Sequence, residues 1–174
     1  MLIDLRQLLS GNKDSVTVEG RLDMSVFDDG VSEYAVSGKE PFELKLVKLG
    51  KNRFTIAAKS FVVLDIPCDR CLEPVSTRID FEVNTAVDME ELAEGGEERE
   101  EKDYIDGYNL DVDRLVFDEI LLSMPGKTLC REDCKGLCLK CGANLNIAEC
   151  GCDRSVTDPR MSVFKDILNN FKEV

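Results

Sequence analysis

Residues 54–83 read FTIAAKSFVVLDIPCDRCLEPVSTRIDFEV, with two apolar-rich runs on either side of a Cys-Asp-Arg-Cys sequence. In the second run, the odd-numbered positions from Val75 to Val83 carry apolar side chains or threonine, and the even-numbered positions are polar. A period of two is typical of a strand with one buried face. Glu73 and Pro74 give a turn signal between the runs. This stretch therefore predicts two strands joined by a short connection.

The same alternation extends toward the N-terminus as far as Ser15. Val16 and Val18 alternate with polar residues, and a shift of phase near Gly20 suggests a β-bulge. The apolar positions that follow are Leu22, Met24, Val26, Phe42, Leu44 and Leu46. Turn signals at residues 28–30, 38 and 50–52 separate the runs. Several strands joined by short turns predict an antiparallel sheet with one buried face.

Three segments have the spacing of helices. Residues 2–10 place leucines at helical intervals, a second helix begins at Asp111 and ends before Pro125, and a third begins at Asp158-Pro159. The expected buried positions of the second helix are Leu115, Val116, Ile120, Leu121 and Leu122. Those of the third are Met161, Phe164, Ile167, Leu168 and Phe171. We expect this last helix to pack back on the sheet.

The expected fold is α+β, an antiparallel β-sheet flanked by a few helices, with a small C-terminal cysteine-rich zinc-knuckle module. We expect a first unit at residues 1–125, and a second unit at 126–174 that holds the cysteines and the final helix. Residues 88–106 combine many acidic side chains with Gly95-Gly96, a composition that cannot bury much apolar surface. This segment therefore predicts a mobile acidic loop.

The chain carries a formal net charge of −13 and contains no histidine. Such an acidic surface repels phosphate backbones, so DNA binding and nonspecific RNA binding are not expected. Basic proteins, among them ribosomal proteins, are suitable partners. The sequence lacks both the roughly 18 continuous apolar residues of a membrane helix and the pattern of a secretory signal. We therefore expect a cytoplasmic protein that does not bind membranes.

Six of the eight cysteines lie within residues 130–152. Thiolates at this density in a reducing compartment favour a metal site over disulfides. Cys138-x-x-Cys141-Gly142 has the form of a zinc knuckle, a tight turn whose backbone N–H groups point at the sulfurs. The first choice of ligands for one ion is Cys130, Cys134, Cys138 and Cys141. Spacing alone does not decide between Cys130 with Cys134 and the alternative pair, Cys150 with Cys152.

An all-cysteine set leaves no open position for water or substrate, so we expect the zinc to be structural. The cysteines left over either remain thiols or join Cys68 and Cys71 at a second site. Cys68-Asp69-Arg70-Cys71 also matches the redox C-x-x-C pattern, but a redox motif should open a helix, and a strand follows here. Arg70 either fixes the turn by bonding carbonyl groups or presents a cation to a partner.

The stretch Cys68-Asp69-Arg70-Cys71-Leu72-Glu73-Pro74-Val75 resembles the signature of the YceD family, whose members are described as large ribosomal RNA subunit accumulation proteins. The segments at 113–122 and 129–138, and Asp158-Pro159-Arg160, are similar to later features of that family. The resemblance spans nearly the whole chain. It implies a role in the synthesis, processing or stability of large-subunit ribosomal RNA, and it directs attention to Cys68, Arg70 and Cys71 as contacts for a partner.

We therefore expect a non-enzymatic ribosome-biogenesis factor. It acts through ribosomal proteins or pre-ribosomal particles, or through one specific ribosomal RNA contact near Arg70. The alternative is a thiol redox or metal-handling protein that uses the C-x-x-C pair. A ribonuclease-like enzyme is a third hypothesis, which the lack of histidine and the closed sulfur set disfavour.

Overall fold

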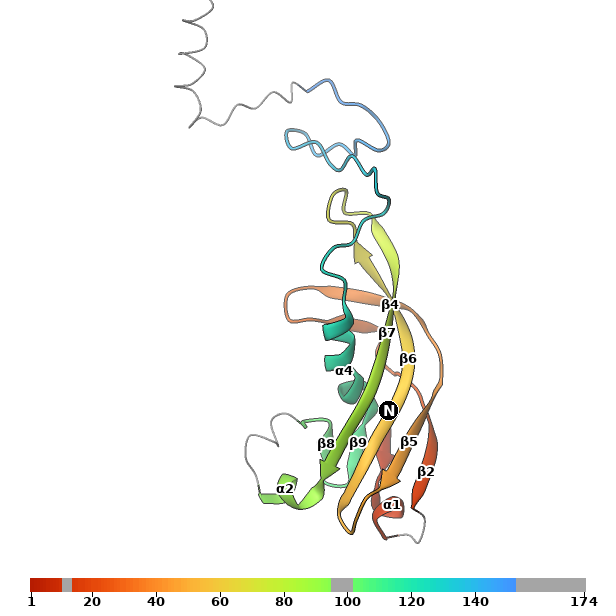
Figure 1. Ribbon diagram of the computed structural model, residues 1–174. Coiled ribbons are helices and arrows are strands. Elements are labelled where there is room, and N and C mark those ends of the chain that lie inside the picture. Colours follow the sequence, from red (N-terminus) through yellow and green to blue (C-terminus); the bar gives the residue numbers. More distant parts are fainter. Residues whose placement is uncertain (11–13, 95–101, 153–174) are drawn as a thin grey trace, which may run out of the picture.

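The computed structural model describes residues 1–10, 14–94 and 102–152 (Figure 1). Its strands are β1 (Leu2–Asp4), β2 (Ser15–Gly20), β3 (Val26–Asp28), β4 (Glu33–Lys39), β5 (Phe42–Lys48), β6 (Arg53–Pro67), β7 (Pro74–Asp88), β8 (Ile105–Asp106) and β9 (Asn109–Asp111). Its helices are α1 (Arg6–Ser10), α2 (Met89–Glu94) and α4 (Val112–Ser123). All pairings between these described strands are antiparallel, which confirms the expected antiparallel sheet with a few helices.

The two longest strands, β6 and β7, form the axis of the molecule. They pair from Arg53 opposite Asp88 to Pro67 opposite Pro74. β7 buries apolar side chains on one face and exposes polar ones on the other, as its alternation predicts; the buried ones are Ile79, Phe81, Val83 and Val87. β5 borders the first half of β6 and β4 borders part of the second half. The hairpin tip, residues 67–74, therefore extends past both neighbouring strands (Figure 1).

The chain does not form the β-bulge expected near Gly20. Instead β2 ends at this residue, and a new strand, β3, begins at Val26, whose side chain is exposed. A Cβ atom at Gly20 would lie 2.8 Å from the ring of Phe42, so the close approach of this ring requires glycine. A shift of register lies in β4, between Val36 and Gly38. The break in alternation at Gly20 thus marks the end of a strand.

Residues 2–10 do not form the single helix that their leucines predict. The first of these residues form β1, which pairs with β9, and only the last five form α1. β1, β9 and β8 make a second, three-stranded sheet. Leu5 and Leu8 are buried, but Leu2 is exposed because side chains alternate between the two faces of a strand. A strand of three residues contains too little alternation to be recognised in the sequence.

Helix α4 begins where the sequence predicts. The Asp111 side chain accepts a hydrogen bond from the backbone N–H of Asp113, which makes Asp111 the N-cap. Three of the expected positions are buried: Leu115, Val116 and Ile120. The prediction was wrong for Leu121 and Leu122, which are exposed. Each residue turns about 100° around the helix axis, so the two residues after Ile120 rotate away from the sheet.

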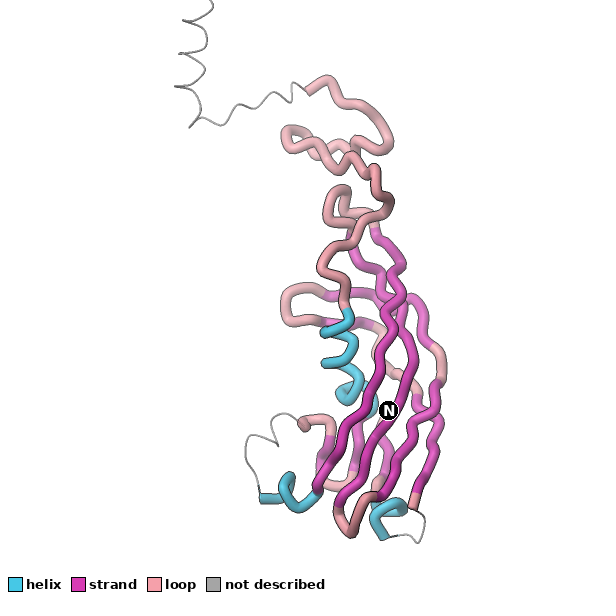
Figure 2. Tube along the Cα trace, viewed as in Figure 1, coloured by secondary structure: helices cyan, strands magenta, loops and turns pink. Residues whose placement is uncertain are grey.

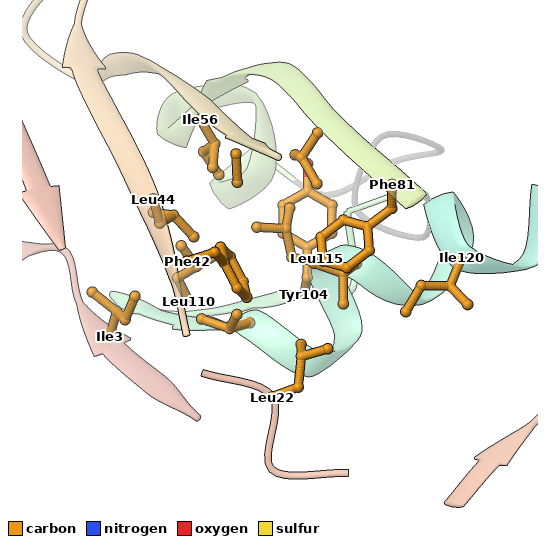
Figure 3. Packing of buried hydrophobic residues seen from close by; sticks show 14 of the residues in the cluster. Ile3, Leu22, Phe42, Leu44, Ile56, Phe81, Tyr104, Leu110, Leu115 and Ile120 are labelled. Carbon is orange, nitrogen blue, oxygen red and sulfur yellow. The ribbon is translucent and has the colours of Figure 1, made fainter. Parts of the chain in front are cut away.

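The hydrophobic core lies between the larger sheet, α4 and the small sheet. Figure 3 shows side chains from these elements converging there, among them Phe42, Phe81, Leu110 and Leu115. The Phe42 and Phe81 rings meet edge to face, with centroids 5.7 Å apart. The buried residues at the hairpin tip form a separate cluster. The body of the sheet therefore has its own core, independent of the tip.

The described parts of the acidic segment at residues 88–106 include regular structure, where the sequence predicts a mobile loop. Residues 89–94 form α2, and Tyr104 is buried in the main core beside β8. Residues 95–101 and the helix expected after Asp158 lie outside the described residues. Within the described ranges, no helix combines the length and the apolar character needed to cross a membrane.

Candidate metal centres

Beyond α4 the chain passes along the hairpin tip and past it as residues 126–152, which contain turns and one isolated β-bridge (Figure 2). All eight cysteines lie at the tip or in this segment, and none forms a disulfide. They make two groups, and within each group the four Sγ atoms all lie within 4.8 Å of one another. Group A is Cys68, Cys71, Cys130 and Cys134. Group B is Cys138, Cys141, Cys150 and Cys152.

The structure divides the four cysteines that the sequence favoured as one set. Cys130 and Cys134 belong to group A, while Cys138 and Cys141 belong to group B. The alternative set, which combined the knuckle with Cys150 and Cys152, coincides with group B. The expected boundary at residues 125/126 runs through group A, because the hairpin tip supplies half of its sulfurs. Zinc binding by either group stays a prediction.

The sulfur spacing in group A matches a tetrahedral metal site. The Sγ atoms of Cys68 and Cys134 are 3.9 Å apart, and those of Cys71 and Cys130 are 3.6 Å apart. A disulfide would require about 2.05 Å. Four sulfurs at about 2.3 Å from a zinc ion form a tetrahedron whose edges are about 3.8 Å. The four side chains of group A could therefore hold such an ion with little movement.

Both C-x-x-C sequences fold into the same turn. The carbonyl of the first cysteine accepts a hydrogen bond from the N–H four residues later, at 2.9 Å for Cys68 and 2.8 Å for Cys138. The N–H of the first cysteine donates to the carbonyl five residues later, at 2.8 and 2.9 Å respectively. The residue after the second cysteine has a positive φ in both turns, 61° at Leu72 and 71° at Gly142. Cys68–Cys71 is thus a second knuckle, and the repeated C-x-x-C was the sequence signal for it.

Backbone donors stabilise a thiolate in group A. Burial favours the neutral thiol of Cys68, but N–H groups of Cys130, Arg70 and Cys71 donate to its sulfur and lower its pKa to about 6. Burial, together with sulfur contacts to Cys71, raises the pKa of Cys130 to about 12. Neighbouring sulfurs cannot all ionise without a counter-charge, because their negative charges repel one another.

Group B shows the same division between its sulfurs. The N–H groups of Cys141 and Lys140 lower the pKa of Cys138 to about 6, as expected for the first cysteine of a knuckle. A contact with the sulfur of Cys141, followed by burial, raises the pKa of Cys152 to about 12. A divalent cation would supply the positive charge that lets all four sulfurs of such a group ionise together.

Hydrogen bonds fasten the cysteine segment to the hairpin tip. The carbonyl of Arg70 accepts the N–H of Leu137 at 3.0 Å, and the guanidinium of Arg70 donates to the carbonyl of Cys134 at 2.8 Å. The N–H of Asp69 donates to the carbonyl of Thr128 at 2.9 Å, and the N–H of Thr128 donates back to the Asp69 carboxylate at 2.8 Å. Arg70 therefore bonds carbonyl groups, as one of the two expectations had it. The carbonyl groups that its guanidinium contacts belong to the cysteine segment, which is distant in the sequence.

The three residues considered as partner contacts differ in accessibility. Cys68 and Cys71 are buried, with 0% and 4% of their surface exposed. Arg70 is exposed. A partner can therefore reach Arg70 but not the two sulfurs in this conformation.

Asn146 is a site residue that sequence reasoning missed. Its side-chain N–H donates to the Sγ of Cys134 at 3.2 Å, and its Oδ1 accepts the N–H of Lys135 at 2.8 Å. Such bonds orient a sulfur ligand and stabilise its charge. Asn146 lies after the knuckle in the sequence, so only the folded chain shows that it serves group A.

A hollow is lined in part by residues of α1 and α2. These two helices lie at the end of the sheet opposite the hairpin tip (Figure 1). The hollow has a volume of about 810 Å³, and its lining includes Leu9, Met89, Leu92, Ile105 and Tyr108. Within the described ranges, the side chains grouped closely enough to hold a metal are all in groups A and B. The cysteine groups are therefore the stronger candidate for a functional centre.

Comparison with known proteins matches the region that contains both cysteine groups to a protein family. Residues 58–168 match the family model described as "Large ribosomal RNA subunit accumulation protein YceD". A protein of Arabidopsis thaliana named "Large ribosomal RNA subunit accumulation protein YCED homolog 1, chloroplastic" is 41% identical over 49 residues, or 28% of this chain and 15% of its own length. The matched family region includes most of β6, all of β7 and all eight cysteines.

Two mycobacterial proteins, both described as uncharacterized, match a longer stretch. The Mycobacterium tuberculosis protein is 32% identical over 103 residues, which cover 58% of this chain and 49% of that protein. The Mycobacterium leprae protein is 30% identical over 110 residues, covering 58% of this chain and 46% of its own length. The chain thus spans about half the length, or less, of these relatives. No solved structure matches it.

Proposed function

The chain belongs to the YceD family, and we propose that it is a non-enzymatic ribosome-biogenesis factor that promotes synthesis, processing or stability of large-subunit ribosomal RNA. The observation that carries this proposal is the family match over residues 58–168, which includes the hairpin tip and both cysteine groups. The Arabidopsis relative, whose name refers to large ribosomal RNA subunit accumulation, supports the same role.

The charge distribution supports a basic protein as the partner. The net charge is −13, and the three cations of β6 and β7 each face a carboxylate. The pairs are Arg53 with Asp88 at 3.2 Å, Lys59 with Glu82 at 2.7 Å and Arg78 with Asp80 at 2.8 Å. Cations held in this way contribute little to binding phosphates. We infer that ribosomal proteins or a pre-ribosomal particle bind the acidic body.

The charged side chains of the cysteine segment nearly balance, and we propose this segment as the place for a specific ribosomal RNA contact. Residues 126–152 contain four basic side chains, Lys127, Arg131, Lys135 and Lys140, against three acidic ones, Glu132, Asp133 and Glu149. The exposed Arg70 adjoins this segment. One contact of this kind is compatible with a chain that repels nucleic acid elsewhere.

The chemistry of the cysteine groups supports a binding role rather than catalysis. A metal held by four sulfurs has no open position at which to activate water or substrate. The chain also has no histidine to act as a general acid or base near neutral pH. We therefore propose that the protein acts by holding partners together.

Depletion of the protein from its own cells tests this function. We expect a loss of mature large-subunit ribosomal RNA relative to small-subunit ribosomal RNA, restored by the wild-type gene. A tagged chain should retain ribosomal proteins at low salt and release them as the salt concentration rises, because screening weakens the attraction between opposite charges. Normal ribosomal RNA on depletion, together with no pre-ribosomal partner, would reject the proposal.

Thiol redox chemistry is the second candidate, and the lowered pKa of Cys68 favours it. Burial of both Cys68 and Cys71 argues against it, because a reactive cysteine must be accessible to its substrate. The reduction potential of a Cys68–Cys71 disulfide, if measured, distinguishes redox chemistry from the binding role. A readily formed Cys68–Cys71 disulfide in the purified protein supports redox chemistry, whereas thiols that resist oxidant support the binding role.

A further inference from the structure

We propose that the chain binds two zinc ions, one in group A and one in group B, and that Cys68 and Cys71 are metal ligands. The first ion fastens residues 130–134 to the tip of the β6–β7 hairpin. The second closes the segment at residues 138–152. This inference is independent of the role in ribosomal RNA accumulation, because it concerns only which side chains hold metal.

Group A has the geometry and surroundings of a closed metal site. Its two measured sulfur–sulfur distances, 3.9 and 3.6 Å, lie on either side of the roughly 3.8 Å expected around zinc. Three of its four sulfurs are buried, and Val75, Leu129 and Leu137 pack against them. Four thiols brought this close without a disulfide form a set that a soft divalent cation stabilises.

A hydrogen-bond donor that can stabilise a charged sulfur is already in place. The side-chain N–H of Asn146 donates a hydrogen bond to the Sγ of Cys134 at 3.2 Å. Hydrogen bonds of this type orient thiolate ligands and stabilise them around a metal. Apolar packing of the cysteines alone would not require such a donor at a sulfur atom.

The two groups use separate ligands and connect different parts of the chain. Each knuckle contributes its pair to a different group, so the two knuckles do not share one ion. In group A, Cys71 and Cys130 lie 59 positions apart in the sequence, and this distance spans β7, the acidic segment and α4. Group B is local. Loss of the first ion should therefore detach the segment from the sheet, whereas loss of the second should not.

Elemental analysis of the purified full-length chain tests the number and the ligands of the sites. We expect two zinc ions per chain in the wild type, one in Cys68→Ser and one in Cys150→Ser. Leu72→Ala and Leu139→Ala change exposed residues inside the two knuckles and should retain two ions. If a single ion were instead held by Cys130, Cys134, Cys138 and Cys141, the Cys68→Ser variant would lose no metal.

A second measurement uses the wild-type chain and so does not depend on whether the variants fold. Zinc is removed stepwise with a chelator, the exposed thiols are alkylated, and mass spectrometry locates the label. We expect the cysteines of group B to react first and together, because Cys141 is exposed and Cys150 and Cys152 are half-buried. The cysteines of group A should follow as a second set when the second ion leaves.

Each remaining outcome contradicts the proposal. One zinc ion per wild-type chain, two in Cys68→Ser, or iron in either site would overturn it. So would alkylation in which Cys68 and Cys71 react before any metal is removed. None of these results bears on ribosomal RNA levels, so failure of this inference and failure of the proposed function are distinguishable.

Discussion

Leu72 adopts a backbone conformation that leucine disfavours. Its φ is 61°, and no other non-glycine residue in the described part of the chain has a positive φ. The left-handed conformation costs an L residue about 1–2 kcal/mol. The side chain is 64% exposed, so packing does not offset this cost. The turn hydrogen bonds that align Cys68 and Cys71 hold the strained residue in place.

We predict that Leu72→Gly stabilises the protein by about 0.5–1 kcal/mol, because glycine adopts a positive φ without strain. Leu139→Gly is the matched control, since Leu139 is exposed in the second knuckle and has no positive φ. It should destabilise by about 0.5–1 kcal/mol, because glycine gains freedom in the unfolded chain. Free energies of unfolding in urea measure both variants. The same sign for both would show that Leu72 is not strained.

Gly136 combines a positive φ with a close contact. Its φ is 74°, and a Cβ atom there would lie 2.9 Å from the carbonyl oxygen of Arg70. That carbonyl accepts the hydrogen bond from Leu137 that joins the cysteine segment to the tip. Gly142 has a similar φ of 71°, but a Cβ atom at Gly142 would meet nothing within 4 Å.

We therefore predict that Gly136→Ala destabilises the docked segment by more than Gly142→Ala. Gly142→Ala should cost about 1 kcal/mol from backbone strain alone. Gly136→Ala should add the displacement of the Arg70 carbonyl, for a total of about 2–3 kcal/mol. Competition with a zinc chelator compares metal retention in the two variants. Equal retention would mean that the contact with Arg70 does not control docking.

At the scale of elements, α4 is held to the sheet by one face. Ile120 is fully buried, whereas Leu122 in the same helix is 81% exposed. We predict that Ile120→Ala destabilises the fold by about 3 kcal/mol, through lost burial and a cavity. Leu122→Ala should change stability by less than about 0.5 kcal/mol. Chemical denaturation followed by circular dichroism measures both. A large effect at Leu122 would indicate a contact that the described residues do not show.

The elements also show where pattern reasoning succeeds. Alternation located β5 and β7, an apolar-rich run located β6, and the N-cap Asp111 located the start of α4, because these signals depend on neighbours in the sequence. β1 was missed since three residues carry no clear period. Leu121 and Leu122 were misplaced since a run of apolar residues does not show which of them faces the sheet.

At the scale of the whole molecule, a sheet body with its own core carries the cysteine segment, which sulfur contacts and hydrogen bonds hold to the hairpin tip. We predict that complete removal of zinc leaves the body folded and releases the cysteine segment from the hairpin tip. Amide hydrogen exchange should become fast at Leu137, Cys138 and Leu145, whose N–H groups donate to carbonyls of the hairpin tip or of the segment itself. Amides in the middle of β6 and β7 should stay protected.

Zinc added back should restore protection in the cysteine segment, which is the control for irreversible damage. Rapid exchange along β6 and β7 after chelation would contradict the prediction, because it would show that metal binding and the folding of the sheet are one cooperative unit. Unchanged exchange at Leu137 and Leu145 would show that hydrogen bonds alone hold the cysteine segment in place.

The sequence by itself determined the antiparallel sheet, the main helix and the presence of knuckle-forming cysteines. Each of these follows from the periodicity or composition of a short stretch. The partners of each cysteine were decided only by the tertiary structure. The eight sulfurs are chemically alike, and spacing left several combinations open. The β6–β7 hairpin decides among them, because its tip carries Cys68 and Cys71 to Cys130 and Cys134, far along the chain, and leaves the second knuckle to Cys150 and Cys152.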